Sequence, residues 1–150
     1  MIALGLSKKV FLAIAAGFTV IVLIGTATSA ISFLSFFVSF RLGLTFSWLL
    51  KITSYLSFII GGFVVGWIVK EKGLIYGGIL GIILKLVSIS IVGLTFFLPT
   101  SLIYGPNFPA GYGQELAQKN IVNQLLSSPI TIMLTAFGGY LGEYFNKSHR

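Results

Sequence analysis

The chain has 150 residues, of which 56% are hydrophobic and only 9% are charged. A soluble domain carries about 25% charged residues, so this chain cannot cover a water-facing surface. Its mean hydropathy of +1.01 predicts an integral membrane protein, and its length allows one domain with about four helices of about 20 residues each. The absence of cysteine excludes disulfides, thiol catalysis, iron–sulfur clusters and cysteine-based zinc sites.

The composition and the apolar runs predict an all-α, polytopic fold with four transmembrane helices in a single domain over residues 1–150. The first uncharged run, Val10–Phe40, is longer than a hydrocarbon core of about 30 Å requires, so we expect its helix to end near residue 33. Lys8 and Lys9 before this run, with small residues after Ile24, also fit a signal peptide, but the run continues to Phe40 and favours an uncleaved anchor. The predicted helices cover residues 10–33, 47–69, 74–98 and 129–145, and a tight polar turn, Lys70–Gly73, joins the second to the third.

The connection 99–128 is the only long one. Its first part is rich in proline and glycine, and irregular backbone of this kind cannot lie in lipid. Its second part, Gln114–Leu126, places Ala117, Ile121 and Leu125 on one helical face. This pattern predicts a short amphipathic helix on the external membrane surface.

Ten Lys and Arg against three Asp and Glu give a net charge of +7. The cations flank the apolar runs instead of forming one patch, which favours lipid headgroups as partners and excludes nucleic acid. If both termini lie on one side, six cations lie on that side and three on the other, so the positive-inside rule places both termini in the cytoplasm. The six cations on the cytoplasmic side are Lys8, Lys9, Lys70, Lys72, Lys147 and Arg150, and the three on the other side are Arg41, Lys51 and Lys119. The predicted location is the plasma membrane.

Small residues four positions apart let two helix backbones approach closely. Three such ridges of glycine predict a four-helix bundle with a glycine zipper near the cytoplasmic face. Residues 61–67 and 138–144 also share a glycine pair, aromatic residues and a further glycine, which indicates two tandem hairpins or a chance recurrence. The predicted helix-packing residues are Gly62, Gly66, Gly73, Gly77, Gly81, Gly138 and Gly142.

Lys85 lies in the middle of the predicted third helix, and an ionisable group at this depth is a candidate functional residue. Depth matching places hydroxyls of Ser54, Ser57 and Thr131–Thr135 beside it, and no carboxylate. We therefore expect Lys85, the candidate intramembrane charge, to be a neutral amine, to lie in a wet cavity, or to take its counter-ion from another protein or a lipid. The alternative is a structural lysine that extends toward an interface or bonds to buried polar groups.

Residues for catalysis are sparse. His149, the single histidine, is the penultimate residue, and the three glutamates, Glu71, Glu115 and Glu143, are scattered. The glycine clusters lack the Gly-Lys-Ser/Thr ending of a phosphate-binding loop. We therefore predict no catalytic residue, no cofactor-binding residue, no metal site and no enzyme activity.

A wider pattern covers most of the chain. It combines a basic start, Phe58–Phe63 at the end of the second helix, a Lys72-Gly73 turn that opens into Tyr76-Gly77-Gly78, and Ala136–Gly142 in the last helix. This pattern resembles a family of small four-helix integral membrane proteins, mainly of Gram-positive bacteria, whose function is unassigned. The resemblance implies four helices, no catalytic residue and a link to protein translocation.

These observations predict a non-catalytic accessory or structural subunit of a larger membrane complex, which contacts other membrane proteins through its glycine ridges, Lys85 and the external loop. The alternative is a small oligomeric channel or transporter in which Lys85 lines an anion-attracting path. The expected partners are the lipid bilayer and other membrane subunits, or further copies of the chain.

Overall fold

The computed structural model describes residues 8–38, 40–95 and 112–148, and all of these except residues 70–72 are α-helical. The described helices are, in chain order, α1 (Lys8–Val38), α2 (Phe40–Val69), α3 (Gly73–Thr95) and α5 (Tyr112–Ser148). Each contains a stretch that is long and apolar enough to cross a membrane: Lys8–Ile31, Lys51–Val69, Gly73–Leu94 and Gln118–Ser148. The predicted all-helical fold with four helices long and apolar enough to span a membrane is therefore confirmed, and it fits a multi-pass membrane protein by length and composition.

The distribution of side chains fits a membrane protein, because many large apolar side chains are exposed. Large apolar side chains point outward; Phe11 is 68% exposed and Met133 is 70% exposed. Buried hydroxyls donate to the carbonyl one turn earlier, as Thr135 does to Thr131 (2.9 Å) and Ser57 does to Ser54 (2.7 Å). These two buried hydroxyls are thus satisfied within their own helix, as a medium without water would require.

Two helix boundaries differ from the sequence prediction. Helix α1 continues to Val38 instead of ending near residue 33, and α2 begins at Phe40 instead of residue 47. Residues 34–38 contain neither glycine nor proline, so nothing in them stops the helix. The bilayer thickness limits the apolar span and does not limit the length of the helix. Helix α3 begins one residue earlier than predicted, and the last predicted residues, 96–98, lie outside the described residues.

Helix α5 joins two segments that the sequence predicted to be separate. It runs from Tyr112 to Ser148 with Pro129 inside it, so the break predicted before Pro129 is absent and residues 112–128 are helical. The hydroxyls of Ser127 and Ser128 donate to the carbonyl oxygen of Gln124, at 3.1 and 2.7 Å. Pro129 lacks the N–H that would bond the Leu125 carbonyl, and α5 nevertheless continues through it. Residues 99–111 of the predicted loop lie outside the described residues.

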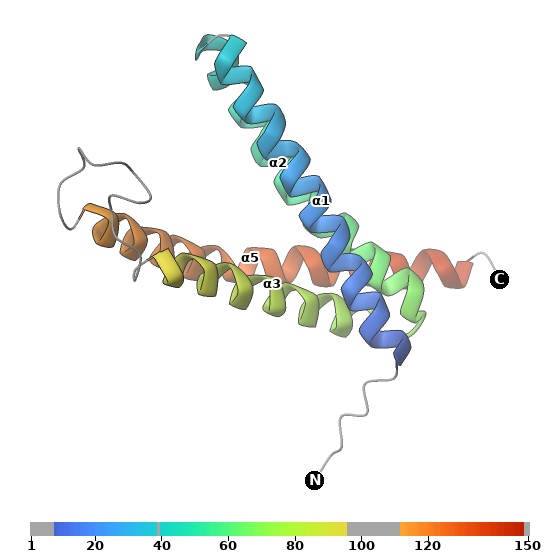
Figure 1. The fold of residues 1–150 in the computed structure, drawn as a ribbon. Helices are drawn as coiled ribbons and strands as arrows, with labels where there is room; N and C mark the ends of the chain where they lie inside the picture. Colours follow the sequence, from blue (N-terminus) through green and yellow to red (C-terminus); the bar gives the residue numbers. More distant parts are fainter. Residues whose placement is uncertain (1–7, 39, 96–111, 149–150) are drawn as a thin grey trace. The chain divides into compact units, whose positions relative to one another are not determined.

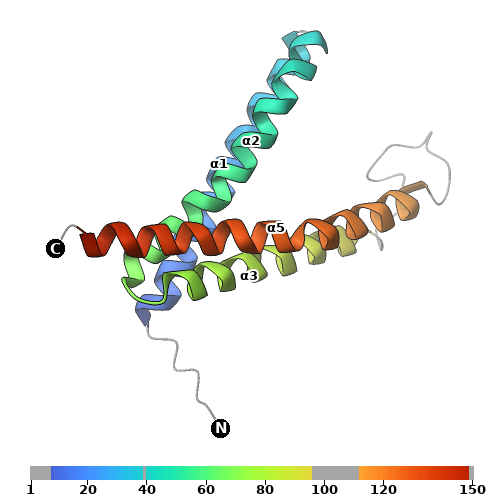
Figure 2. The same ribbon diagram turned by 180° about the vertical axis from the view of Figure 1, so that it is seen from behind.

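The chain divides into two compact units, Met1–Gly81 with Thr131–Arg150, and Ile82–Ile130. In the first unit, α1 and α2 lie side by side and run in opposite directions (Figures 1 and 2). In the second unit, the later part of α3 lies beside the first part of α5, as both views show. A single transmembrane domain over residues 1–150 stays a prediction.

Candidate functional site

Helices α2 and α5 pack backbone against backbone in the first unit. A methyl group added to Gly62 would overlap the carbonyl oxygen of Thr135, and one added to Gly66 would overlap that of Gly139. The overlapped atoms belong to the main chain, so no side chain could turn away to make room. These two positions of α2 therefore require glycine at the present helix separation.

The same contact is made in the reverse direction. A methyl group on Gly138 would overlap the carbonyl oxygen of Ile59, and one on Gly142 would overlap that of Phe63. Each residue of α5 in this contact lies 76 positions after its counterpart in α2, as Gly138 does after Gly62. The two helices run in the same direction and meet through equivalent residues, as two copies of one surface do across a two-fold axis.

Helix α3 contacts the same two α5 carbonyls, those of Thr135 and Gly139. Methyl groups on Gly73 and Gly77 would overlap the carbonyl oxygens of Gly139 and Thr135, and one on Gly81 would overlap the hydroxyl of Thr135. All seven glycines that the sequence singled out for packing are buried, and they contact other helices of the same unit. In the folded chain these ridges are therefore occupied.

Helix α1 contributes a close contact that the sequence analysis missed. A methyl group on Gly17 would lie 2.6 Å from the carbonyl oxygen of Gly61 and 2.6 Å from the Val65 side chain. Ala13, one turn before Gly17, is fully buried. Two small residues four apart, Ala13 and Gly17, were the available signal. Glycine pairs alone were considered, so this pair was overlooked.

Lys85 on α3 contacts two neutral side chains of α5 in the second unit. Its ammonium donates to Oε1 of Gln124 (3.0 Å) and to the hydroxyl of Ser127 (2.9 Å). The Ser127 hydroxyl in turn donates a hydrogen bond to the Gln124 carbonyl (3.1 Å). An ammonium has three donors, and within the described segments the structure gives Lys85 these two acceptors.

The partners of Lys85 differ from those that depth matching predicted. Thr131–Thr135 were expected beside it, because the fourth helix was expected to begin at Pro129. In the first unit, Gly73 of α3 contacts the Gly139 carbonyl of α5. Lys85 lies twelve residues after Gly73, and its partner Ser127 lies twelve residues before Gly139. The antiparallel register is thus the same in both units, and only a helix that continues through residues 112–128 provides it. Gln124 and Ser127 were missed because they were assigned to a surface segment.

A second polar cluster lies where α2 turns into α3. Glu143 accepts the Gly73 amide on Oε2 (2.6 Å) and pairs with Lys147 through Oε1 (2.6 Å). Lys70 and Lys72 adopt left-handed backbone conformations, with φ of 69° and 54°. The carboxylate caps the first turn of α3, where backbone amides have no partner within the helix.

The described residues contain no group of three or more His, Asp and Glu that could hold a metal ion. His149 lies outside those residues. A comparison with known protein families found no match, and searches of curated proteins and of solved structures found no similar protein. The resemblance to the four-helix family therefore stays a prediction.

Proposed function

We propose that this chain is a non-catalytic integral membrane protein that serves as an accessory or structural subunit of a larger membrane complex. The sequence assigned the glycine ridges to helix packing and also to partner contacts, and they are occupied by the chain's own helices. A partner must therefore use a different surface. The cluster of Lys85, Gln124 and Ser127 is the feature that supports this proposal best.

The physical argument concerns the charge of Lys85. An ammonium inside an apolar helix costs several kcal/mol unless it is paired or hydrated. Its two acceptors, Gln124 and Ser127, are neutral, and its neighbours Ile82 and Leu86 are exposed by 47% and 61%. A transmembrane helix that carries a carboxylate would supply the missing charge and accept the third hydrogen. The expected partner is therefore an acidic membrane-spanning segment, and protein translocation is the process to which the family resemblance points.

The proposed arrangement has two tandem hairpins, α1–α2 and α3–α5, in the plasma membrane, with both termini in the cytoplasm. The constant shift of 76 positions between the packing residues of α2 and α5 supports the repeat. In this arrangement the amino-terminal part of α5, around Lys119, lies toward the external surface.

The test is to isolate the full chain with its surrounding lipid by polymer extraction. A photo-crosslinking residue replaces Leu86, beside Lys85, and in a control protein it replaces Ile75, which is similarly exposed at 54%. We expect a cross-link from position 86 to a different polypeptide and none from position 75. Lys85→Leu should abolish the cross-link, whereas Lys119→Leu, which removes an exposed lysine of the same unit, should leave it.

The alternative function is an oligomeric channel or transporter in which Lys85 attracts anions. It predicts cross-links only between copies of this chain, together with anion flux in liposomes that Lys85→Leu abolishes. Self-cross-links with flux would replace the accessory proposal with this alternative. The absence of any cross-link to another polypeptide would also refute the accessory proposal.

A further inference from the structure

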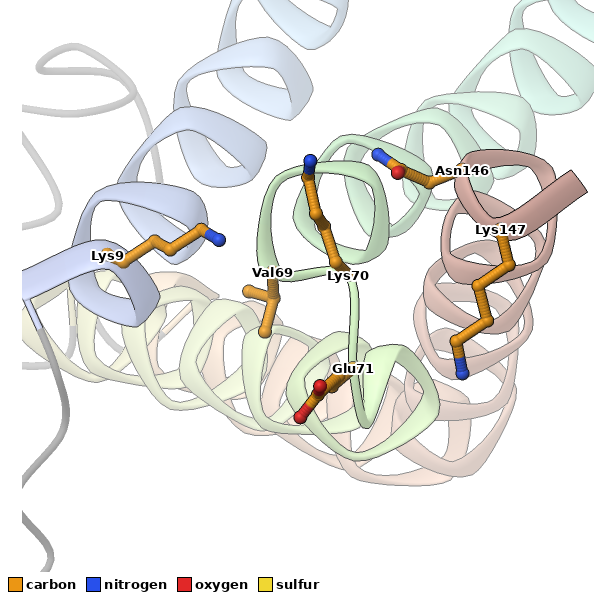
Figure 3. Close-up of a pocket in the computed structure, with 6 residues that line it drawn as sticks. All are labelled: Lys9, Val69, Lys70, Glu71, Asn146 and Lys147. Carbon is orange, nitrogen blue, oxygen red and sulfur yellow. The ribbon is translucent and has the colours of Figure 1, made fainter. Parts of the chain in front are cut away.

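A polar pocket lies beside the turn between α2 and α3, at the same end of the first unit as Lys9 of α1 and the last turn of α5. Its volume is about 420 Å³, within the range of about 300–1,000 Å³ that is typical of ligand sites. Side chains from three helices and one turn surround it, as Figure 3 shows. We call it the lysine pocket; its lining residues are Lys9, Val69, Lys70, Glu71, Asn146 and Lys147.

The charges around the lysine pocket are mostly positive. Lys147 is paired with Glu143, and Asn146 donates its amide to the Trp67 carbonyl (2.8 Å). In Figure 3 the Lys9 side chain extends toward the turn, and the side chains of Lys70 and Glu71 leave the turn in opposite directions. The part of the chain that the structure describes shows no ion pair for Lys9 or Lys70. Two ammonium groups are thus available for an anion.

The backbone of the turn holds Lys70 in a conformation that is unfavourable for lysine. Its φ of 69° is left-handed, and its amide donates to the Gly66 carbonyl (3.0 Å), as in a helix end that glycine usually occupies. Glycine would adopt this conformation without the steric penalty that lysine carries. Fold stability alone therefore favours glycine at position 70. Lys72 has the same left-handed backbone, and of the two lysines only Lys70 lines the pocket.

An apolar groove lies on the last turns of α2, the helix whose final residue, Val69, lines the lysine pocket. It has a volume of about 340 Å³ and is lined by Phe63, Val64, Trp67 and Ile68 of α2, and we call it the Trp67 groove. The ring of Phe63 stacks on Trp67 with centroids 5.7 Å apart, and Trp67 is 42% exposed. Asn146, which lines the lysine pocket, bonds to the carbonyl of Trp67, which lines the groove. Tryptophan at such a polar–apolar boundary is typical of the membrane interface.

We propose that the lysine pocket and the Trp67 groove together bind one anionic phospholipid. The phosphate lies between the ammonium groups of Lys9 and Lys70, and an acyl chain lies along Phe63 and Trp67. A zwitterionic lipid brings a cation of its own next to these lysines and binds less tightly. Basic pockets between transmembrane helices recognise anionic headgroups in this way.

The test uses fluorescence quenching in the full chain. The chain has two tryptophans, and a Trp48→Phe background leaves Trp67 as the single reporter. The protein is reconstituted in phosphatidylcholine vesicles that contain phosphatidylglycerol with brominated acyl chains, and in matched vesicles with brominated phosphatidylcholine. We expect brominated phosphatidylglycerol to quench Trp67 preferentially, with a relative association constant about tenfold above that of phosphatidylcholine.

Matched variants distinguish lipid binding in the lysine pocket from a general attraction of anionic lipid to any nearby lysine. Lys9→Gln with Lys70→Gln should bring the association constants close to equal. Lys8→Gln with Lys72→Gln removes the same charge from the neighbouring positions, which do not line the pocket, and should keep most of the preference. If wild type shows no preference, or if both double variants lose it equally, the proposal is wrong.

Two further measurements complete the test. Lys70→Gly should raise the melting temperature, because it relieves the left-handed lysine, and should lower the lipid preference; a preserved preference would overturn the role of Lys70. Inorganic phosphate added to phosphatidylcholine vesicles should neither bind the protein nor compete with phosphatidylglycerol. Competition by phosphate would identify a site for small anions and would overturn the lipid assignment.

Discussion

The contact between α2 and α5 makes a sharp prediction for Gly66→Ala. The new methyl group would overlap the Gly139 carbonyl oxygen and would lie 2.8 Å from the Gly139 carbonyl carbon and 3.0 Å from the Glu143 nitrogen. Ordinary contacts begin near 3.4 Å, so the two helices must separate by about 0.6 Å or more. The atoms that would have to move are all main-chain atoms, which rules out local repacking.

The magnitude follows from that separation. A gap of 0.5–1 Å removes roughly a quarter to a half of the dispersion energy of each affected atom pair. The neighbouring contacts at Gly62, Gly138 and Gly142 belong to the same interface and loosen with it. Overpacking in a well-packed interior costs about 1–3 kcal/mol, and we expect the upper end of that range. A loss of about 3 kcal/mol changes the ratio of folded to unfolded protein by about a hundredfold.

The assay is reversible unfolding in mixed micelles by titration with a denaturing detergent, followed by tryptophan fluorescence. Gly25→Ala is the matched control, because a methyl group at Gly25 meets nothing within 4 Å. Alanine is favoured over glycine inside a helix by about 0.5–1 kcal/mol, so this control should be neutral or slightly stabilised. If Gly66→Ala unfolds within about 1 kcal/mol of Gly25→Ala, the close approach of α2 and α5 is refuted.

Three further predictions follow from other contacts. Glu143→Ala removes the acceptor of the first α3 amide and should increase hydrogen exchange in that turn, with a loss of about 1 kcal/mol; unchanged exchange would contradict the capping role. Gly62→Ala and Gly138→Ala occupy equivalent positions and should destabilise to similar extents, and the double variant should lose less than the two single losses combined; full additivity would argue against one shared interface. Because the chain has no cysteine of its own, a single cysteine at Glu71 should react with an impermeant reagent from the cytoplasmic side and one at Lys119 from the external side; labelling of both from one side would refute the proposed topology.

The amino-acid pattern was sufficient for the number of spans and for the polar turn. Four apolar runs separated by charges allow little else, because lipid requires every backbone group to bond within a helix. The helix ends were harder to predict. Hydropathy reports where a side chain prefers lipid, whereas α1 and α5 continue past the apolar spans as far as Val38 and back to Tyr112. Pro129 suggested a helix start because proline is common in the first turn of a helix, whereas in the structure it lies inside α5.

The candidate sites were also predicted only in part. Glycine spacing identified residues that pack, because close backbone approach depends on the absence of a side chain. The pairing of those residues depends on three-dimensional register, and the sequence could not supply it. Gln124 was for this reason assigned to a surface helix, although it accepts a hydrogen bond from Lys85. The lysine pocket was missed because it combines α1, the turn and α5, which are far apart in the chain.

The shift that relates α2 to α5 bears on the role of Lys85. The positions 76 residues before the packing glycines of α5 are glycines of α2. The positions 76 residues before Gln124 and Ser127 are Trp48 and Lys51. If two hairpins arose from one ancestor, both kept the residues that packing requires. The acceptors of Lys85 occur in the second hairpin alone, so close packing does not require them. An intramembrane ammonium is costly, and a costly group that packing does not need is best explained by a function in the second unit, which contains Lys85.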